Sequence, residues 1–292
     1  MLFLFLAVLC GTIKGYFGKR ISSFGDTASA CVHMQLFRLV ICAAVGGGML
    51  LFRMPPVVIA EPGEVLVDLL SGVSTAVFLI SWTLAAHSDA YMLVTACNTA
   101  AFLVPMLFGF FFFDESISGK QIAGIVSIVL AVFFLVLYNN KIKAKFTFKS
   151  GLLLFILFLT QGIVDASKKL YTYRYPEGSN ESFQFFTFLI AALCLLLFQG
   201  VHLIRNKGKS TGEPLPKKVY AFLTVMAVCL FLTSYFLTLA TKTVASVILF
   251  PLNSLLSLAT ATLMAVFFFG EKITWTSAVG LVFTFAALFL VA

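Results

Sequence analysis

Long apolar stretches recur along the whole chain and are separated by short polar or turn-forming segments. A helix of about 20 apolar residues crosses a bilayer core of about 30 Å, so each stretch is long enough to span a membrane. The stretches are continuously apolar, as in Phe102–Phe113, and do not alternate every second residue as barrel strands do. The pattern therefore predicts an all-α, polytopic membrane protein of ten helices. The predicted spans are residues 2–20, 28–52, 64–86, 90–113, 119–138, 150–172, 182–204, 218–240, 244–269 and 273–292.

The composition supports this prediction and excludes a water-soluble globular protein. Hydrophobic residues make up 61% of the chain and charged residues only 11%, with a mean hydropathy of +1.04. A globule of this composition lacks the polar side chains that an aqueous surface needs. The connections between spans are too short to hold a soluble domain, so we expect lipid to be the solvent for most of the fold.

The cysteines and the first span need separate interpretation. The six cysteines all fall inside predicted spans without C-x-x-C spacing, so we expect neither disulfides nor a metal site, and no cofactor. The segment Ala7–Cys10 superficially resembles a lipoprotein signal. However, no basic residue precedes the apolar run, and Leu9 is bulky where processing requires a small residue. We therefore interpret residues 2–20 as a membrane helix.

The connections between spans differ strongly in positive charge. Ten helices place both termini on one side, and the connections on the other side carry twelve Lys and Arg residues, against four on the side of the termini. The positive-inside rule then predicts that the basic loops 141–149 and 205–218 are cytoplasmic and that both termini are outside. A basic rim beside anionic lipid accounts for the net charge of +8, so no nucleic-acid partner is implied.

The two halves of the chain resemble each other. Phe111–Ser118 aligns with Phe267–Thr274, and Gln35 aligns with Gln184 in the second spans of the two halves. A repeat of five helices, being odd, forces the halves into opposite orientations, an arrangement found in alternating-access carriers.

We therefore predict two inverted five-helix repeats around a central cavity. The first repeat covers residues 1–140, the second covers residues 150–292, and residues 141–149 link them.

Several motifs together resemble a known family. They are Leu9–Gly11 in the first span, Arg38 in the second, and the Phe-Phe-Phe-x-Glu segments that end at Glu115 and Glu271, each followed by Ile-Ser or Ile-Thr. With the ten predicted spans, the chain resembles the EamA-type members of the drug/metabolite transporter superfamily, most closely in Phe250–Thr274. This resemblance implies a basket of eight helices around a central cavity, with spans 119–138 and 273–292 outside it. It also implies transport of small metabolites, and its members usually have cytoplasmic termini, contrary to the charge count.

Charged residues inside spans are the first candidates for a transport path. Among acidic residues only Asp165 is predicted to lie well inside a span, and among basic ones Lys14, Arg38, Lys168 and Lys169. Each costs about 2.5–3.5 kcal/mol near the bilayer centre, so each should face a cavity or a partner. The candidate substrate-binding residues are Lys14, His33, Gln35, Arg38, Trp82, Asn98, Asp165, Gln184, Tyr235 and Asn253.

Lys14 shares one helical face with Gly11, Gly15 and Gly18. One interpretation is a helix-packing seam with the ammonium reaching toward the interface. The other is an anion-binding ammonium beside a cavity.

Asp165 also has two interpretations. Lys168 and Lys169, at i+3 and i+4, can neutralise it within its own helix, or it can bind substrate and couple transport to protons. Inverted symmetry places Lys14 and Asp165 roughly 10 Å apart in depth. This separation suits a zwitterion whose carboxylate lies at Lys14 and whose amine lies at Asp165.

Two helix faces carry further polar candidates. Gln35 and Arg38 share a face of the second span, with Gln184 at the repeat-equivalent place. Arg38 either contacts substrate or holds helix ends together through backbone carbonyls. His33 is either a proton carrier or a structural residue.

A second group of candidates surrounds a predicted kink. Pro251 lacks a backbone donor and bends the ninth span next to Asn253, while Asn98 lies at a near-equivalent position in the fourth. Trp82 and Tyr235 lie in corresponding spans and are able to stack on a substrate.

Two glutamates are predicted to have a different role. Glu115 and Glu271 lie at the ends of their spans, so we interpret them as structural or gate-forming residues.

No catalytic motif accompanies these residues. Gly208-Lys209-Ser210 lacks the first glycine of a P-loop, since position 203 is Leu, and no hydrolase or dinucleotide motif is present. The sequence therefore predicts a secondary-active transporter, not an enzyme, in a bacterial inner membrane, with rocking of its two halves. Its partners are the bilayer and a small polar or amphipathic substrate, such as an amino acid. No ATPase subunit is implied, and a monomer is expected. A lipid-modifying intramembrane enzyme and a non-transporting scaffold remain alternatives.

Overall fold

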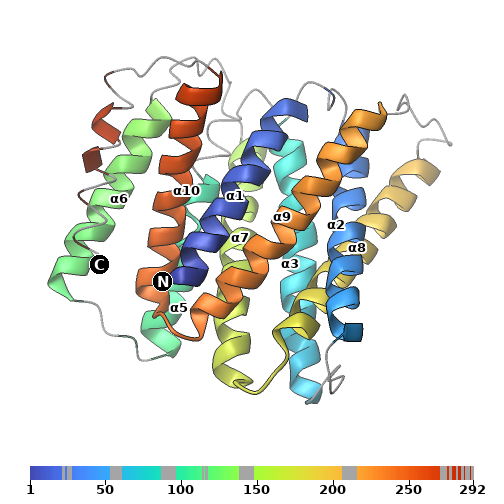
Figure 1. Ribbon diagram of the computed structural model, residues 1–292, viewed down its shortest axis with the longest axis horizontal. Helices are drawn as coiled ribbons and strands as arrows, with labels where there is room; N and C mark the ends of the chain where they lie inside the picture. Colours follow the sequence, from blue (N-terminus) through green and yellow to red (C-terminus); the bar gives the residue numbers. More distant parts are fainter. Residues whose placement is uncertain are drawn as a thin grey trace.

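The fold is described from a computed structural model. The described residues are 1–21, 24, 28–52, 61–86, 97–113, 115, 118–137, 148–205 and 216–269, together with part of 275–290. The helices are α1 (Leu2–Ile21), α2 (Ala28–Phe52), α3 (Pro62–Ala86), α5 (Leu103–Phe112), α6 (Gly119–Leu137), α7 (Phe148–Arg174), α8 (Asn180–Arg205), α9 (Lys217–Thr241) and α10 (Ser246–Phe269). Within these residues the chain forms helices and no strand (Figure 1), which confirms the all-α prediction.

Seven of these helices are long and apolar enough to cross a membrane, namely α1, α2, α3, α7, α8, α9 and α10. Their bounds follow the predicted spans within a few residues, because apolar length determines both. The tenth predicted span, 273–292, lies largely outside the described residues. Within the described residues, seven of the ten predicted spans are therefore confirmed as helices of this length, and the count of ten stays a prediction.

The predicted span 90–113 departs from a continuous helix. It is helical at residues 97–100, turns at Ala101 and Phe102, and continues as α5. Pro105 has no N–H to donate to the carbonyl of Ala101, and the N–H of Val104 bonds that carbonyl instead, at 3.1 Å. The proline explains why the helix tightens at this point.

The helices pack in pairs that join the N-terminal and C-terminal halves of the chain. In Figure 1, α1 and α9 cross in front of α3 and α7, with α2 and α8 on one side and α5 and α10 on the other. The most extensive contacts are α1 with α9, α3 with α7, α2 with α8 and α3 with α8. The interior therefore lies between the α1–α9 pair and the α3–α7 pair.

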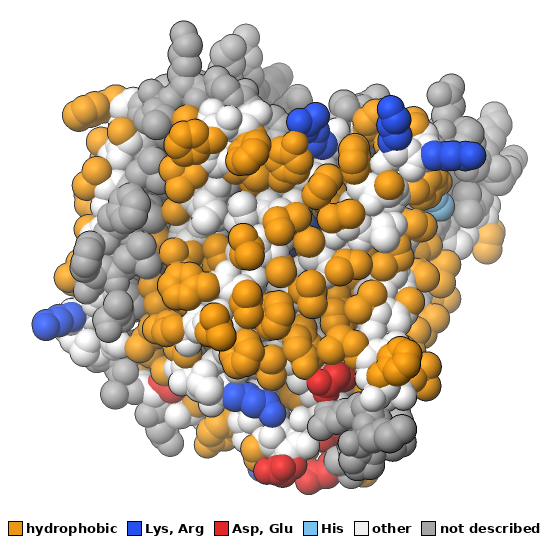
Figure 2. Space-filling view, viewed as in Figure 1, with side chains coloured by type: hydrophobic (Ala, Val, Ile, Leu, Met, Phe, Trp, Pro, Cys, Tyr) orange, Lys and Arg blue, Asp and Glu red, His pale blue; other side chains and the backbone are white. Residues whose placement is uncertain are grey.

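The surface has the polarity of a membrane protein. Large apolar side chains are exposed along the helices, among them Leu197 (71%) and Phe267 (79%). In Figure 2 they cover the middle of the molecule, while Lys and Arg gather at the upper end and acidic side chains at the lower end. A soluble protein does not leave this much contiguous apolar surface in water. The chain is a membrane-embedded helical protein.

We call the two ends of the molecule the basic end and the opposite end. The basic end comprises the end of α1 and the start of α9, which expose Lys19, Arg20, Lys217 and Lys218. The opposite end comprises the start of α3 and the turns that follow α7 and α9, where acidic and basic residues are mixed.

Candidate functional site

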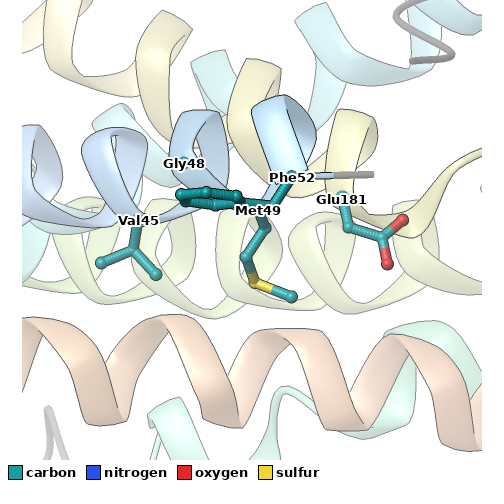
Figure 3. A pocket seen from close by; sticks show the side chains of 5 residues that line it. All are labelled: Val45, Gly48, Met49, Phe52 and Glu181. Carbon is teal, nitrogen blue, oxygen red and sulfur yellow. The ribbon is translucent and has the colours of Figure 1, made fainter. Parts of the chain in front are cut away.

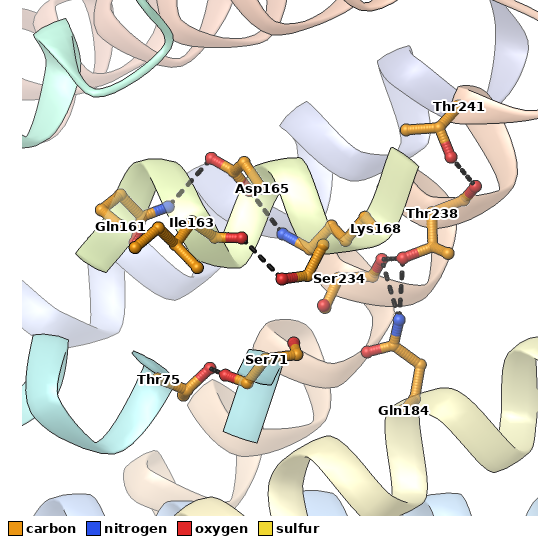
Figure 4. A network of polar contacts seen from close by, with 11 residues as sticks. Ser71, Thr75, Gln161, Ile163, Asp165, Lys168, Gln184, Ser234, Thr238 and Thr241 are labelled. Carbon is orange, nitrogen blue, oxygen red and sulfur yellow. Dashed lines mark hydrogen bonds and ion pairs between the residues drawn. The ribbon is translucent and has the colours of Figure 1, made fainter. Parts of the chain in front are cut away.

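The interior between α3, α7, α8 and α9 is lined by polar side chains (Figure 4), and we call this set the polar core. Its members are all buried. They are Ser71 of α3, Asp165, Ser167, Lys168 and Thr172 of α7, Gln184 of α8, and Thr238 and Thr241 of α9. Such groups are costly in a membrane unless they bond to one another.

Asp165 is neutralised within its own helix. Lys168 Nζ lies 2.6 Å from Asp165 Oδ1, and the amide of Gln161 donates to Oδ2 at 3.0 Å. Of the two interpretations of Asp165, the structure therefore agrees with neutralisation within its own helix, and the partner is Lys168. Lys169, the other predicted partner, turns to a different carboxylate.

Lys169 pairs with Glu115 at the opposite end of the molecule. Lys169 Nζ lies 3.0 Å from Glu115 Oε1, and the other carboxylate oxygen accepts the N–H of Val247 at 3.1 Å. Lys169 also donates to the carbonyl of Thr241 at 3.4 Å. The segment after α5, α7, and the α9–α10 connection are thus joined around a cavity of about 330 Å³.

Further bonds close the same end between α7 and α9. The hydroxyls of Thr172 and Thr241 lie 2.9 Å apart, and the ammonium of Lys242 donates to the carbonyl of Pro176 at 3.1 Å. Gln184 of α8 adds a third helix by donating to the Thr238 hydroxyl at 2.8 Å. These bonds therefore join α7, α8 and α9 at the opposite end.

Lys14 and Arg38 bring uncompensated positive charge toward the polar core. Lys14 lies within electrostatic range of Arg38 and Lys168. Within the described part of the chain, no ion pair or hydrogen bond of Lys14 is found. Arg38 donates to Gln35 Oε1 at 2.7 Å, but its Nε is buried without a partner. Of these three cations, Lys168 is the one that pairs with Asp165.

The other predicted residues lie in different surroundings. His33 is exposed, so the structure does not bring it to the polar core. Trp82 packs in an apolar cluster with Phe78 and leucines of α7. Tyr235 donates to Glu181 Oε1 at 2.8 Å and stacks on Phe231.

The residues of the predicted kink lie partly inside the protein. Pro251 is buried within α10, and Asn253, two residues later, is half-buried. The side-chain carbonyl oxygen of Asn98 is buried without a hydrogen-bond partner. Glu271 lies outside the described residues, so its predicted role stays a prediction.

A second cavity of about 460 Å³ lies beside α2. It is lined by Val45, Gly48, Met49, Phe52 and Glu181 (Figure 3). Neither of the two cavities described here is lined by Lys14 or Asp165. The central cavity expected from the sequence therefore stays a prediction.

The sequence analysis missed two buried acids. Glu64 and Asp68 of α3 are each only 3% exposed, which corrects the expectation that Asp165 is the only acidic residue well inside a span. Both residues lie near the start of the predicted span 64–86. The available signal was the spacing of Glu64, Asp68 and Ser71, which places all three on one helical face.

Comparison with known proteins supports the fold and nothing more specific. No protein-family profile and no curated protein matches this chain. One solved structure, described only as a crystal structure of a protein, superposes with a TM-score of 0.78 at 15% identity. The match covers 99% of this chain and 94% of that one, so the same architecture extends over nearly both lengths.

Proposed function

We propose that this protein is a secondary-active carrier of a small metabolite with a carboxylate or similar anionic group. The observation that carries the proposal is the meeting of Lys14, Arg38 and the Asp165–Lys168 pair inside a membrane-embedded bundle. Buried charges are expensive in a bilayer and are retained where they line a substrate or ion path. A scaffold without transport has no use for this cost.

The helix contacts support inverted repeats. Inverted repeats require that each contact of one repeat has a counterpart when equivalent helices are exchanged. The equivalent pairs are α1 and α7, α2 and α8, α3 and α9, and α5 and α10. This exchange turns the α1–α9 contact into α7–α3 and the α2–α9 contact into α8–α3. It also converts α1–α10 into α7–α5, and every one of these contacts is present. In Figure 1, α1 and α7 run in opposite directions. This is the pattern expected of the EamA-type architecture that the sequence resembles.

The α7–α9 contact departs from this symmetry. α7 and α9 are joined at the opposite end, whereas their counterparts, α1 and α3, make at most a marginal contact in the described part of the chain. An alternating-access carrier closed at one end has this asymmetry, because the two repeats then adopt different conformations. We further propose that the basic end is cytoplasmic in a bacterial inner membrane.

The charges favour a substrate with an anionic group. Lys14 and Arg38 have donors free for a carboxylate, whereas Asp165 is already engaged by Lys168 and Gln161. A zwitterion held between Lys14 and Asp165 would have to displace Lys168. Amino acids remain substrates under this proposal, with recognition centred on the carboxylate.

Counterflow into proteoliposomes tests the proposal. A panel of amino acids, carboxylates, nucleobases, amines and sugars is offered to vesicles preloaded with each compound. We expect counterflow of a carboxylate-bearing compound, with its apparent affinity reduced about 10- to 100-fold in Lys14→Met and in Arg38→Met.

The matched control is Lys218→Met, which removes an exposed charge at the basic end and should leave counterflow unchanged. Absence of counterflow with every compound would end the carrier proposal. Formation of a new product in the vesicles would favour the intramembrane enzyme instead.

A further inference from the structure

The packed helices α3 and α8 each carry a buried polar face. On α3 the face consists of Glu64, Asp68 and Ser71, at intervals of four and three residues, which is the spacing of one helical stripe. On α8 the same intervals separate Asn180, Gln184 and Thr187. All six residues are buried, with exposed fractions from 0% to 4%.

The packing of Gly72 fixes how the two faces are aligned. A Cβ at Gly72 would lie 2.9 Å from the carbonyl oxygen of Thr187 and 2.6 Å from Cβ of Ile190, so α3 and α8 touch at this level. Both helices run from the opposite end toward the basic end (Figure 1). Since the rise per residue is equal, Asp68 lies about one turn below this contact, at the level of Gln184.

Five oxygen atoms on these faces are buried without a hydrogen-bond partner. They are Asp68 Oδ1, Ser71 Oγ, Asn180 Oδ1, Gln184 Oε1 and Thr187 Oγ1. Buried polar atoms in native proteins nearly always have partners, and five such atoms on two facing stripes need a common explanation. A group of positive charge between the helices provides one.

The two amides are oriented so that their oxygens stay available. Asn180 donates its NH₂ group to the carbonyl of Tyr235 at 3.2 Å, and Gln184 donates to Thr238 at 2.8 Å. Both donors are therefore directed to α9. The oxygen of each amide is buried without a donor.

Two carboxyl groups are buried at the α3 side of this interface. Glu64 is the electrostatic neighbour of Asp68, so two carboxyl groups lie one turn apart on α3. The side chains packed beside them are Val67, Tyr171, Tyr175 and Phe183, an apolar and aromatic cluster. The lysines of α7 on this side are engaged elsewhere, Lys168 by Asp165 and Lys169 by Glu115.

We propose that the α3–α8 interface is a binding site for a monovalent metal cation of the sodium type. Its ligands are oxygens of Asp68, Ser71, Gln184 and Thr187, with Glu64 and Asn180 completing the site toward the opposite end. Hard cations take oxygen ligands, and neutral oxygens outnumber carboxylates here, which suits a single positive charge. A role as the coupling ion rests on the proposed carrier function, whereas cation binding itself does not.

Thermal unfolding of the purified full chain in detergent tests the site. The unfolding temperature is measured in NaCl, KCl and choline chloride at equal ionic strength. A cation that binds only the folded state raises it saturably, and we expect such a rise with NaCl and not with choline chloride. Asp68→Asn should abolish the rise.

Three further variants make the test independent of folding defects. Ser71→Ala and Thr187→Ala each remove one neutral oxygen and should raise the sodium concentration of half-maximal effect about tenfold. Glu61→Gln removes an exposed acid at the same end of α3 and should keep the wild-type response.

Three results would overturn the site: no sodium-specific rise in the wild type, an unchanged rise in Asp68→Asn, or equal responses in all three salts. Counterflow is measured separately, so a failed transport assay with an intact sodium response refutes the carrier alone. A successful transport assay without that response refutes the cation site alone.

Discussion

At the residue scale, ion pairs determine which buried charges are available. Asp165 and Glu115 are each held by a neighbouring lysine, and both pairs are largely buried. Lys14 and Arg38 lack a carboxylate partner and lie close enough to influence each other. The paired residues therefore stabilise this conformation, and under the proposed function the unpaired cations are the groups that bind the substrate.

The Glu115–Lys169 pair gives a stability prediction. Glu115→Gln leaves Lys169 uncompensated in a largely buried position, which should lower the free energy of unfolding by about 3–5 kcal/mol. Thermal or denaturant unfolding in detergent measures the change. Combining Glu115→Gln with Lys169→Met should recover a large part of the loss.

Lys120→Met, an exposed lysine at the same end, is the control and should be neutral. Equal losses in the double and single variants would contradict a direct interaction between Glu115 and Lys169.

At the element scale, the sequence predicted the helices well and their contacts poorly. Apolar length alone determines a span, so α1, α2 and α9 match their predicted bounds closely. Lys14, Arg38 and Asp165 were also visible as charges inside apolar runs. Glu64 and Asp68 were missed because burial near a helix end depends on α7 and α8 packing over it. Their spacing places them on one face of α3 but does not show that another helix covers this face.

Close helix packing at glycine gives an element-scale prediction. Gly72→Ala places a methyl group against Thr187 and Ile190 of α8 and should destabilise the protein by about 1–3 kcal/mol. Gly48→Ala in α2 is the matched control, because nothing lies within 4 Å of its added Cβ. It should be neutral or stabilising by up to about 1 kcal/mol. Equal unfolding temperatures for the two variants would contradict the α3–α8 contact.

At the scale of the whole molecule, the contacts define which parts are able to move. The sequence suggested rocking of residues 1–140 against residues 150–292. In the structure α1 lies along α9 and α3 lies along α7, so each packed pair contains helices from both halves. We infer that the α1–α9 pair moves against the α3–α7 pair, with the Lys169–Glu115 and Thr172–Thr241 contacts opening when the basic end closes.

Two spin-label distances in one sample series test this alternation most directly. In a background without the six native cysteines, labels at Lys19 and Leu84 report the basic end, and labels at Arg174 and Lys242 report the opposite end. All four positions are exposed. On addition of the transported compound found by counterflow, the first distance should shorten while the second lengthens. Two distances that stay unchanged, or that lengthen together, would contradict a carrier that opens its ends alternately.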